Sequence, residues 1–311
     1  RAVATAANFR GRLARMRPFP EVPGLEVEHD FVDARGLRFH VAQAGTGPPV
    51  LALHGWPQSW WAWAKVLPAL AEHHRVICPD LRGLGWSEAP PRGYDKETFA
   101  DDMLAVMDAL GLERVRLMGH DWGAWAAFLL AVRHPERFDS VVVLNITPPW
   151  TGPEASTALA LANAWRAWYQ FVLAAPVLGR QVRRRMVLGR ALRADNVHAD
   201  AFSDEDVAIF ADAFQEPARA RASQWIYRDF IAREAPRVAR GTYETRPLTV
   251  PTLLMHGEHD RVITPDMVRA SMRPDDRLEV EFVPDSGHWI LQEKPDLVAE
   301  RALWWFREAH A

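Results

Sequence analysis

Gly119-His120-Asp121-Trp122-Gly123 lies between two segments of different character. The apolar run 115–118 just before it is typical of a short strand, and the run 124–130 just after it is typical of a helix. A sharp turn from strand to helix, with small residues on both sides, lifts its central side chain above a sheet, where a substrate can reach it. Glycine suits such a turn because the backbone is crowded there. We therefore predict that Asp121 is a nucleophile at the tip of this turn, which we call the elbow (residues 119–123).

An aspartate at this place selects a particular chemistry. A carboxylate nucleophile attacks an electrophilic sp³ carbon, as in an epoxide or an alkyl halide, and leaves an alkyl ester on the enzyme. That ester must be hydrolysed before the enzyme can turn over. The sequence should therefore also contain a general base that activates water.

His288, in Ser286-Gly287-His288-Trp289, follows the last predicted strand and is the candidate base. Histidine is the usual choice because its pKa lies near neutral pH. Such a histidine needs a carboxylate to orient it. Asp260 follows the preceding predicted strand and is the candidate acid, whereas the strand after the elbow helix ends at Asn145, which cannot hold a charge. Asp121, Asp260 and His288 thus follow the chain order nucleophile, acid, histidine.

Ester hydrolysis passes through a tetrahedral intermediate whose negative oxygen needs hydrogen-bond donors. The backbone N–H of Trp122, just after the nucleophile, is one candidate donor. The turn His54-Gly55-Trp56-Pro57 after an early strand offers a second, the N–H of Trp56. We predict that these two groups form the oxyanion hole, and that His54 and His120 shape the two turns by hydrogen bonding.

Strand and helix patterns alternate along most of the chain, which predicts an α/β fold with a mainly parallel sheet covered on both faces. Strand patterns disappear across 148–248, where we expect a helical cap over the carboxyl ends of the strands. The predicted units are an N-terminal arm at 1–24, a core at 25–147 and 249–311, and the cap at 148–248. The expected strands are 25–32, 37–44, 49–53, 76–79, 115–118, 140–144, 252–257 and 278–283, and the expected core helices are 60–70, 98–110, 124–130 and 295–310.

Composition narrows the remaining classes. The chain has 311 residues, 49% hydrophobic content and a net charge of -3, so neither nucleic acid nor an anionic membrane is an expected partner. No apolar run reaches the roughly 18 residues of a membrane span. Cys78 is the single cysteine, which fits a reducing compartment, and the N-terminal stretch has no signal-peptide pattern. We expect a cytoplasmic protein without metal or cofactor, and the sequence leaves a homodimer open.

Four motifs together resemble the epoxide hydrolases of the α/β-hydrolase superfamily: HGWP at 54–57, GHDWG at 119–123, GEHD at 257–260 and SGHW at 286–289. The resemblance covers roughly residues 25 to 308 and is thinner in the cap. It implies an α/β-hydrolase fold and cofactor-free hydrolysis of a small-molecule epoxide to a vicinal diol.

The resemblance also implies two cap tyrosines that donate hydrogen bonds to the epoxide oxygen and protonate the emerging alkoxide. Tyr169 and Tyr227 match these positions by their local context. A phenol, with a pKa of about 10, can supply the proton that the alkoxide needs. The side chains expected to line the substrate pocket are Trp56, His120, Trp122, Trp168 and Trp289.

Two other functions remain open at this point. A haloalkane dehalogenase shares the aspartate nucleophile, but it would bind halide with N–H donors and would leave the tyrosine pair without a role. Many dehalogenases of this fold also have asparagine where this chain has Trp56. A non-catalytic ligand-binding protein on the same fold is the more remote alternative, because all the groups needed for turnover are present.

Overall fold

The structure is a computed structural model that describes residues 18–153, 155, 165–176, 179, 181, 185–194 and 196–308. Most of the expected N-terminal arm, residues 1–17, lies outside this part of the chain. Phe19 stacks on His29, with ring centroids 4.0 Å apart, so the described end of the arm packs against the first strand. Within the described residues, no helix is long and apolar enough to cross a membrane.

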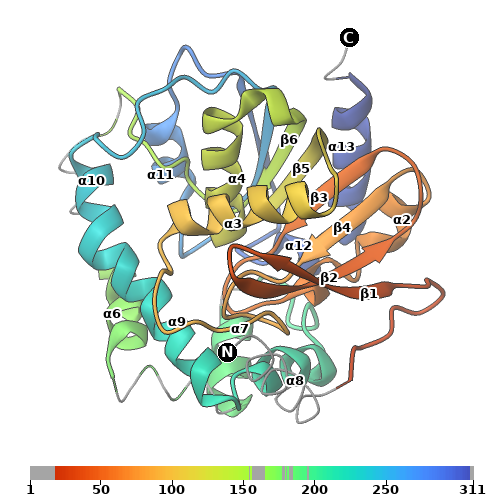
Figure 1. The fold of residues 1–311 in the computed structure, drawn as a ribbon. Helices are drawn as coiled ribbons and strands as arrows, with labels where there is room; N and C mark the ends of the chain where they lie inside the picture. The colour runs from red at the N-terminus through yellow and green to blue at the C-terminus, as the bar shows by residue number, and fades with distance from the viewer. Residues whose placement is uncertain are drawn as a thin grey trace.

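An eight-stranded sheet forms the centre of the molecule (Figure 1), in the order β1-β2-β4-β3-β5-β6-β7-β8. The first two strands form the expected antiparallel hairpin, in which Ala34 pairs with Leu37, and the pairings from β4 to β8 are all parallel. This confirms the predicted α/β class. The strands are β1 (Glu28–Ala34), β2 (Leu37–Ala44), β3 (Pro49–Leu53), β4 (Arg75–Pro79), β5 (Val115–His120), β6 (Phe138–Leu144), β7 (Thr252–Gly257) and β8 (Leu278–Val283).

Helices cover both faces of the sheet because successive strand residues point to opposite faces. In β3, Leu51 and Leu53 join a core cluster with α3 (Lys96–Ala109) and α4 (Trp122–Arg133). The alternate residues Val50 and Ala52 join a second cluster with the terminal helix. The helices of this second face are α2 (Leu67–Ala71), α12 (Ile290–Glu293) and α13 (Pro295–Glu308).

The helix expected over 60–70 is in fact two shorter helices. Trp60–Trp63 forms a 3₁₀ turn, and α2 starts afresh at Leu67. Pro68 lacks a backbone N–H and therefore fits the first turn of a helix but not its interior. The sequence pattern missed this break because the apolar spacing continues across it.

Between β6 and β7 the described residues form helices and no strand. We call the part of the chain from Asn145 to Pro251 the inserted segment; Figure 1 shows its helices α6 to α10 grouped to one side of the sheet. They are α6 (Trp168–Ala174), α7 (Arg185–Ala194), α8 (Asp204–Ala213), α9 (Pro217–Asp229) and α10 (Ala235–Ala239), with a 3₁₀ turn at Trp165–Ala167 and a π-helical turn at Phe230–Glu234 between α9 and α10. After β7, α11 (Pro265–Ser271) leads to β8.

Candidate active site

Asp121 lies between β5 and α4 in a backbone conformation that few residues adopt. Its φ is 51° and its ψ is -126°, which is strained for a side chain with a Cβ. The neighbouring glycines permit the turn. A Cβ on Gly119 would lie 2.6 Å from the Cα of Ala124, and one on Gly123 would lie 2.3 Å from the carbonyl oxygen of Leu53. The strand-turn-helix geometry expected for a nucleophile is therefore present in the chain.

The turn after β3 approaches this carboxylate closely. The backbone N–H of Trp56 donates to Asp121 Oδ1 at 2.9 Å, so one of the two predicted oxyanion donors already contacts the nucleophile. The indole Nε1 of Trp56 donates to Ser223 Oγ of α9 at 2.6 Å, which ties the turn to the inserted segment. The hydrogen bond from the Trp56 N–H therefore holds Asp121 Oδ1 in place from the turn after β3.

Replacing Gly55 by alanine should strongly impair the site. Its Cβ would lie 2.3 Å from Asp121 Oδ1 and 2.4 Å from Asp121 Cβ, so the nucleophile or the turn must move. A displacement of about 1 Å costs roughly 100-fold in rate, while overpacking costs about 1–3 kcal/mol of stability. Turnover and thermal unfolding should be measured on the same variant. Gly111→Ala is the control. It strains the backbone, since φ at Gly111 is +67°, but no atom lies within 4 Å of the added Cβ, so its activity should stay normal. A Gly55→Ala enzyme of normal activity would contradict this close approach.

His288 joins the two carboxylates. Its Nε2 lies 3.7 Å from Asp121 Oδ2, and its Nδ1 donates to Asp260 Oδ2 at 2.9 Å. All three side chains are buried. A water molecule between Nε2 and the carboxylate carbon would have its base on one side and its target on the other. The structure therefore brings together the three residues predicted as nucleophile, base and acid.

Asp260 is held from several sides as an ionised acid. Its Oδ1 accepts hydrogen bonds from the backbone N–H groups of Val262 and Ile263, both at 2.8 Å. Burial favours the neutral acid, but the charge of His288 and these hydrogen bonds outweigh it and hold the pKa of Asp260 below its usual range. An acid that stays ionised can fix the imidazole tautomer throughout turnover.

Asn145 has a role that the sequence did not indicate. Its Nδ2 donates to Asp260 Oδ2 and to the carbonyl oxygen of Gly287, both at 3.0 Å. It therefore orients the acid and the loop that holds His288. In the sequence, position 145 stands out only as an alternative site for the acid. Its place just after β6, beside β7, is the signal that could have indicated its contact with Asp260.

Burial opposes protonation of His288, yet the Asp260 and Asp121 carboxylates together raise its pKa above the ordinary range. The two carboxylates therefore favour the imidazolium form of His288. Loss of the charge on Asp121 would remove one of the two groups that favour this protonated form.

The two predicted tyrosines come together near the nucleophile. Tyr227, in α9, is 2% exposed, and its ring centroid lies 5.2 Å from that of Trp56 and 6.0 Å from that of Tyr169. Burial, together with Tyr169 and the negative charge of Asp121, raises the pKa of Tyr227 above its usual value. The phenol therefore remains protonated and able to donate over the working pH range.

The residues expected to line the pocket occupy different environments. Trp289 packs edge-on against His288, with centroids 4.8 Å apart, and Trp56 and Trp122 both contact Tyr227. His120 is fully buried and its Nε2 donates to the backbone oxygen of His288, so it supports the base from behind. Trp168 is 62% exposed in α6 and lies apart from this group, so the structure does not enclose its ring as expected for a pocket wall.

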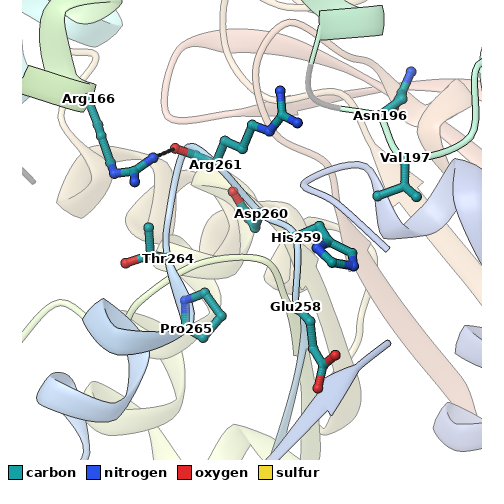
Figure 2. A pocket seen from close by; sticks show the side chains of 9 residues that line it. All are labelled: Arg166, Asn196, Val197, Glu258, His259, Asp260, Arg261, Thr264 and Pro265. Carbon is teal, nitrogen blue, oxygen red and sulfur yellow. Dashed lines mark hydrogen bonds between the residues drawn. The ribbon is translucent and has the colours of Figure 1, made fainter. Parts of the chain in front are cut away.

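A cavity of about 500 Å³, lined mostly by residues of polar type, lies between the inserted segment and the turn after β7 that carries Asp260. Figure 2 shows Arg166 reaching across to this turn, where its Nη1 donates to the carbonyl oxygen of Arg261 at 3.0 Å. Of the three central residues, only Asp260 contributes to the wall. Its lining residues are Arg166, Asn196, Val197, Glu258, His259, Asp260, Arg261, Thr264 and Pro265.

The chain is similar to a known protein family and to several characterised proteins. Residues 48–295 match the model of the α/β-hydrolase fold family. The soluble epoxide hydrolase of Corynebacterium sp. (strain C12) is 33% identical over 90% of this chain and 98% of its own length. Among solved structures, the epoxide hydrolase CorEH superposes with a TM-score of 0.76 at 30% identity, covering 91% of this chain and 99% of the other. Cfl2 from Burkholderia cenocepacia gives 0.78 at 29% identity, covering 94% and 99%.

Proposed function

The chain belongs to the α/β-hydrolase family and, within it, to the epoxide hydrolases, and we propose that it hydrolyses an epoxide to a vicinal diol through an alkyl ester on Asp121. The observation that supports this mechanism most directly is the buried phenol of Tyr227 beside the elbow, with His288 Nε2 3.7 Å from the nucleophile. The Tyr227 phenol can donate to the epoxide oxygen, and His288 can activate water.

In the first half-reaction, Asp121 attacks an epoxide carbon from the side opposite the C–O bond. Oδ1 is held by the Trp56 N–H, so we assign the attack to Oδ2, and Oδ1 becomes the ester carbonyl oxygen. The C–O bond of the epoxide breaks, and Tyr169 and Tyr227 stabilise and protonate the oxygen. A phenol donates well here because an alkoxide is far more basic than a phenolate.

In the second half-reaction, water attacks the ester carbon. Ester formation has removed the charge of Asp121, so the pKa of His288 falls and its neutral form can accept a proton from water. Trp56 N–H stabilises the negative charge that develops on Oδ1, and Trp122 N–H is the second proposed donor. His288 has by then returned its first proton to the phenolate left by epoxide opening, and the proton that it takes from water restores the imidazolium. When the intermediate collapses, the ester C–O bond breaks and the leaving alkoxide takes the proton of the added hydroxyl, which releases the diol and restores the carboxylate.

We assign residues 148–248 to a cap over the core formed by 25–147 and 249–311. Contacts such as that of Trp56 with Ser223 support this division, because they join the nucleophile's turn to α9. The cavity beside Asp260 lies between these two units. A haloalkane dehalogenase is not favoured, since halide binding would give the two phenols no role.

Turnover in H₂¹⁸O tests the covalent route. In a single turnover with excess enzyme and styrene oxide, ¹⁸O should enter the carboxylate of Asp121 and not the diol, because water attacks the ester carbon. Peptide mass analysis locates the label, and on later cycles the diol should acquire it. A diol labelled in the first turnover, with unlabelled Asp121, would show direct attack of water on the epoxide and exclude the ester.

A further inference from the structure

Lys96 and Glu234 form a buried ion pair close to the elbow that the proposed chemistry does not use. Lys96 is the first residue of α3, and its side chain is 0% exposed. Its Nζ lies 2.5 Å from Glu234 Oε2, and its backbone N–H donates to Glu234 Oε1 at 2.8 Å. Removing two charges from water is unfavourable unless their geometry is good, and an apolar pair would often serve stability equally well. The burial of the Lys96–Glu234 pair therefore points to a role beyond stability.

The Lys96 ammonium group contacts Trp122 and Ile226, which are the sequence neighbours of Asp121 and Tyr227. Lys96 Nζ lies 4.4 Å from the ring centroid of Trp122, which follows the nucleophile Asp121. It also donates to the carbonyl oxygen of Ile226, which precedes Tyr227, at 3.3 Å. One side chain of the core therefore contacts both the elbow and the helix that presents the phenol.

Glu234 fixes the same region from the other side. It ends the π-helical turn Phe230–Glu234, which directly follows α9, the helix of Tyr227. Tyr243 OH donates to Glu234 Oε1 at 2.7 Å, so the carboxylate is held by more than the lysine. In a π-helical turn the backbone hydrogen bonds join residues five apart instead of four, and such turns are frequent at functional sites. Because this turn continues α9 directly, Glu234 is attached to the C-terminal end of the helix that carries Tyr227.

We propose that the Lys96–Glu234 ion pair is a positioning device that holds the Tyr227 phenol at a fixed place over the Asp121 elbow. This rests on the proposed epoxide hydrolysis. Both residues act through the helix that carries Tyr227 and do not contact the substrate; Lys96 meets Trp122 at its indole ring and not at the backbone N–H proposed for the oxyanion hole. The phenol is needed when the epoxide opens but not when water attacks the ester. Loss of the pair should therefore slow ester formation and spare ester hydrolysis.

The test uses the double variant Lys96→Met/Glu234→Gln, because a single change would leave one buried charge without its partner. Rapid quenching and intact mass give the rates of ester formation and ester hydrolysis with styrene oxide. Ester formation should fall by about 10- to 100-fold while hydrolysis stays within about twofold, since the displaced group acts only in the first step. A folded double variant that forms the ester at the wild-type rate would overturn the proposal.

A second comparison shows whether the effect passes through Tyr227. In a Tyr227→Phe background the double change should slow ester formation little further, because coupled residues are not additive. A loss that multiplies with that of Tyr227→Phe would contradict the positioning role. Should the double variant melt below the usual assay temperature, both rates are compared with those of the wild type at a temperature below its melting point. Equal effects on both steps would overturn the proposal.

Arg82→Met/Asp102→Asn is the matched control. It removes another buried ion pair, which links the loop after β4 to α3. Ester formation should remain at the wild-type rate in this variant. A wild-type enzyme that forms no ester with a panel of epoxides would refute the proposed function itself, which is a different result from unchanged rates in the double variant.

Discussion

Replacing His288 by alanine should stop the reaction after its first half and leave the substrate attached to Asp121. The base lies on the side of Asp121 Oδ2 at 3.7 Å and is needed only for water. General base catalysis contributes roughly 10²- to 10⁴-fold, so diol formation should fall by a comparable factor while ester formation survives. Intact mass after incubation with styrene oxide should show an adduct equal to the full mass of the epoxide.

The control for this experiment removes the nucleophile. Asp121→Ala in the His288→Ala background should abolish the adduct, and peptide mapping of the parent variant should place it on Asp121. Incubation with 1-bromobutane separates the two chemistries that share this nucleophile, because a dehalogenase would acquire only a butyl group. An adduct on another residue would refute the assigned nucleophile.

Replacing both Tyr169 and Tyr227 by phenylalanine should abolish epoxide opening. Loss of one preorganised donor to a developing oxyanion costs about 10²- to 10³-fold, and here both donors to the leaving oxygen disappear. Asp121, Asp260 and His288 do not depend on either hydroxyl group for their contacts. The variant should therefore fold normally, and the loss should appear in the rate of ester formation measured by rapid quenching.

The single variants sharpen this result. Tyr227 is 2% exposed, whereas Tyr169 is only partly buried, so Tyr227→Phe should have the larger effect of the two. An ester supplied by an alkyl halide, if one reacts, should be hydrolysed at the same rate with or without the phenols. Normal epoxide turnover in the double phenylalanine variant would show that another group protonates the oxygen.

Several features of this site could be predicted from sequence because they depend on local backbone geometry. Gly119 and Gly123 on either side of Asp121 predict a crowded turn, and the structure shows the atoms that a Cβ would meet there. Placement of Asp260 and His288 after consecutive strands predicted their proximity, since the carboxyl ends of parallel strands meet at one edge of the sheet.

Other features depend on residues that are far apart in the chain. The Lys96 N–H and the Glu234 carboxylate are separated by 138 positions, and no local pattern links them. Trp168 is on the same helix as Tyr169 and shares its aromatic context, yet it is 62% exposed. Which side of α6 faces the core depends on how α6 packs against α9, and that packing has no signature in either segment alone.

The sequence by itself determined the sheet class, the strand-turn-helix that presents Asp121 and the chain order of Asp121, Asp260 and His288, because each follows from turn geometry or strand alternation within a few residues. Only the tertiary structure placed Asn145 on the acid, Ser223 on the Trp56 indole and Lys96 against Trp122. These contacts arise when separate elements pack, and packing is decided by the whole set of neighbours at once.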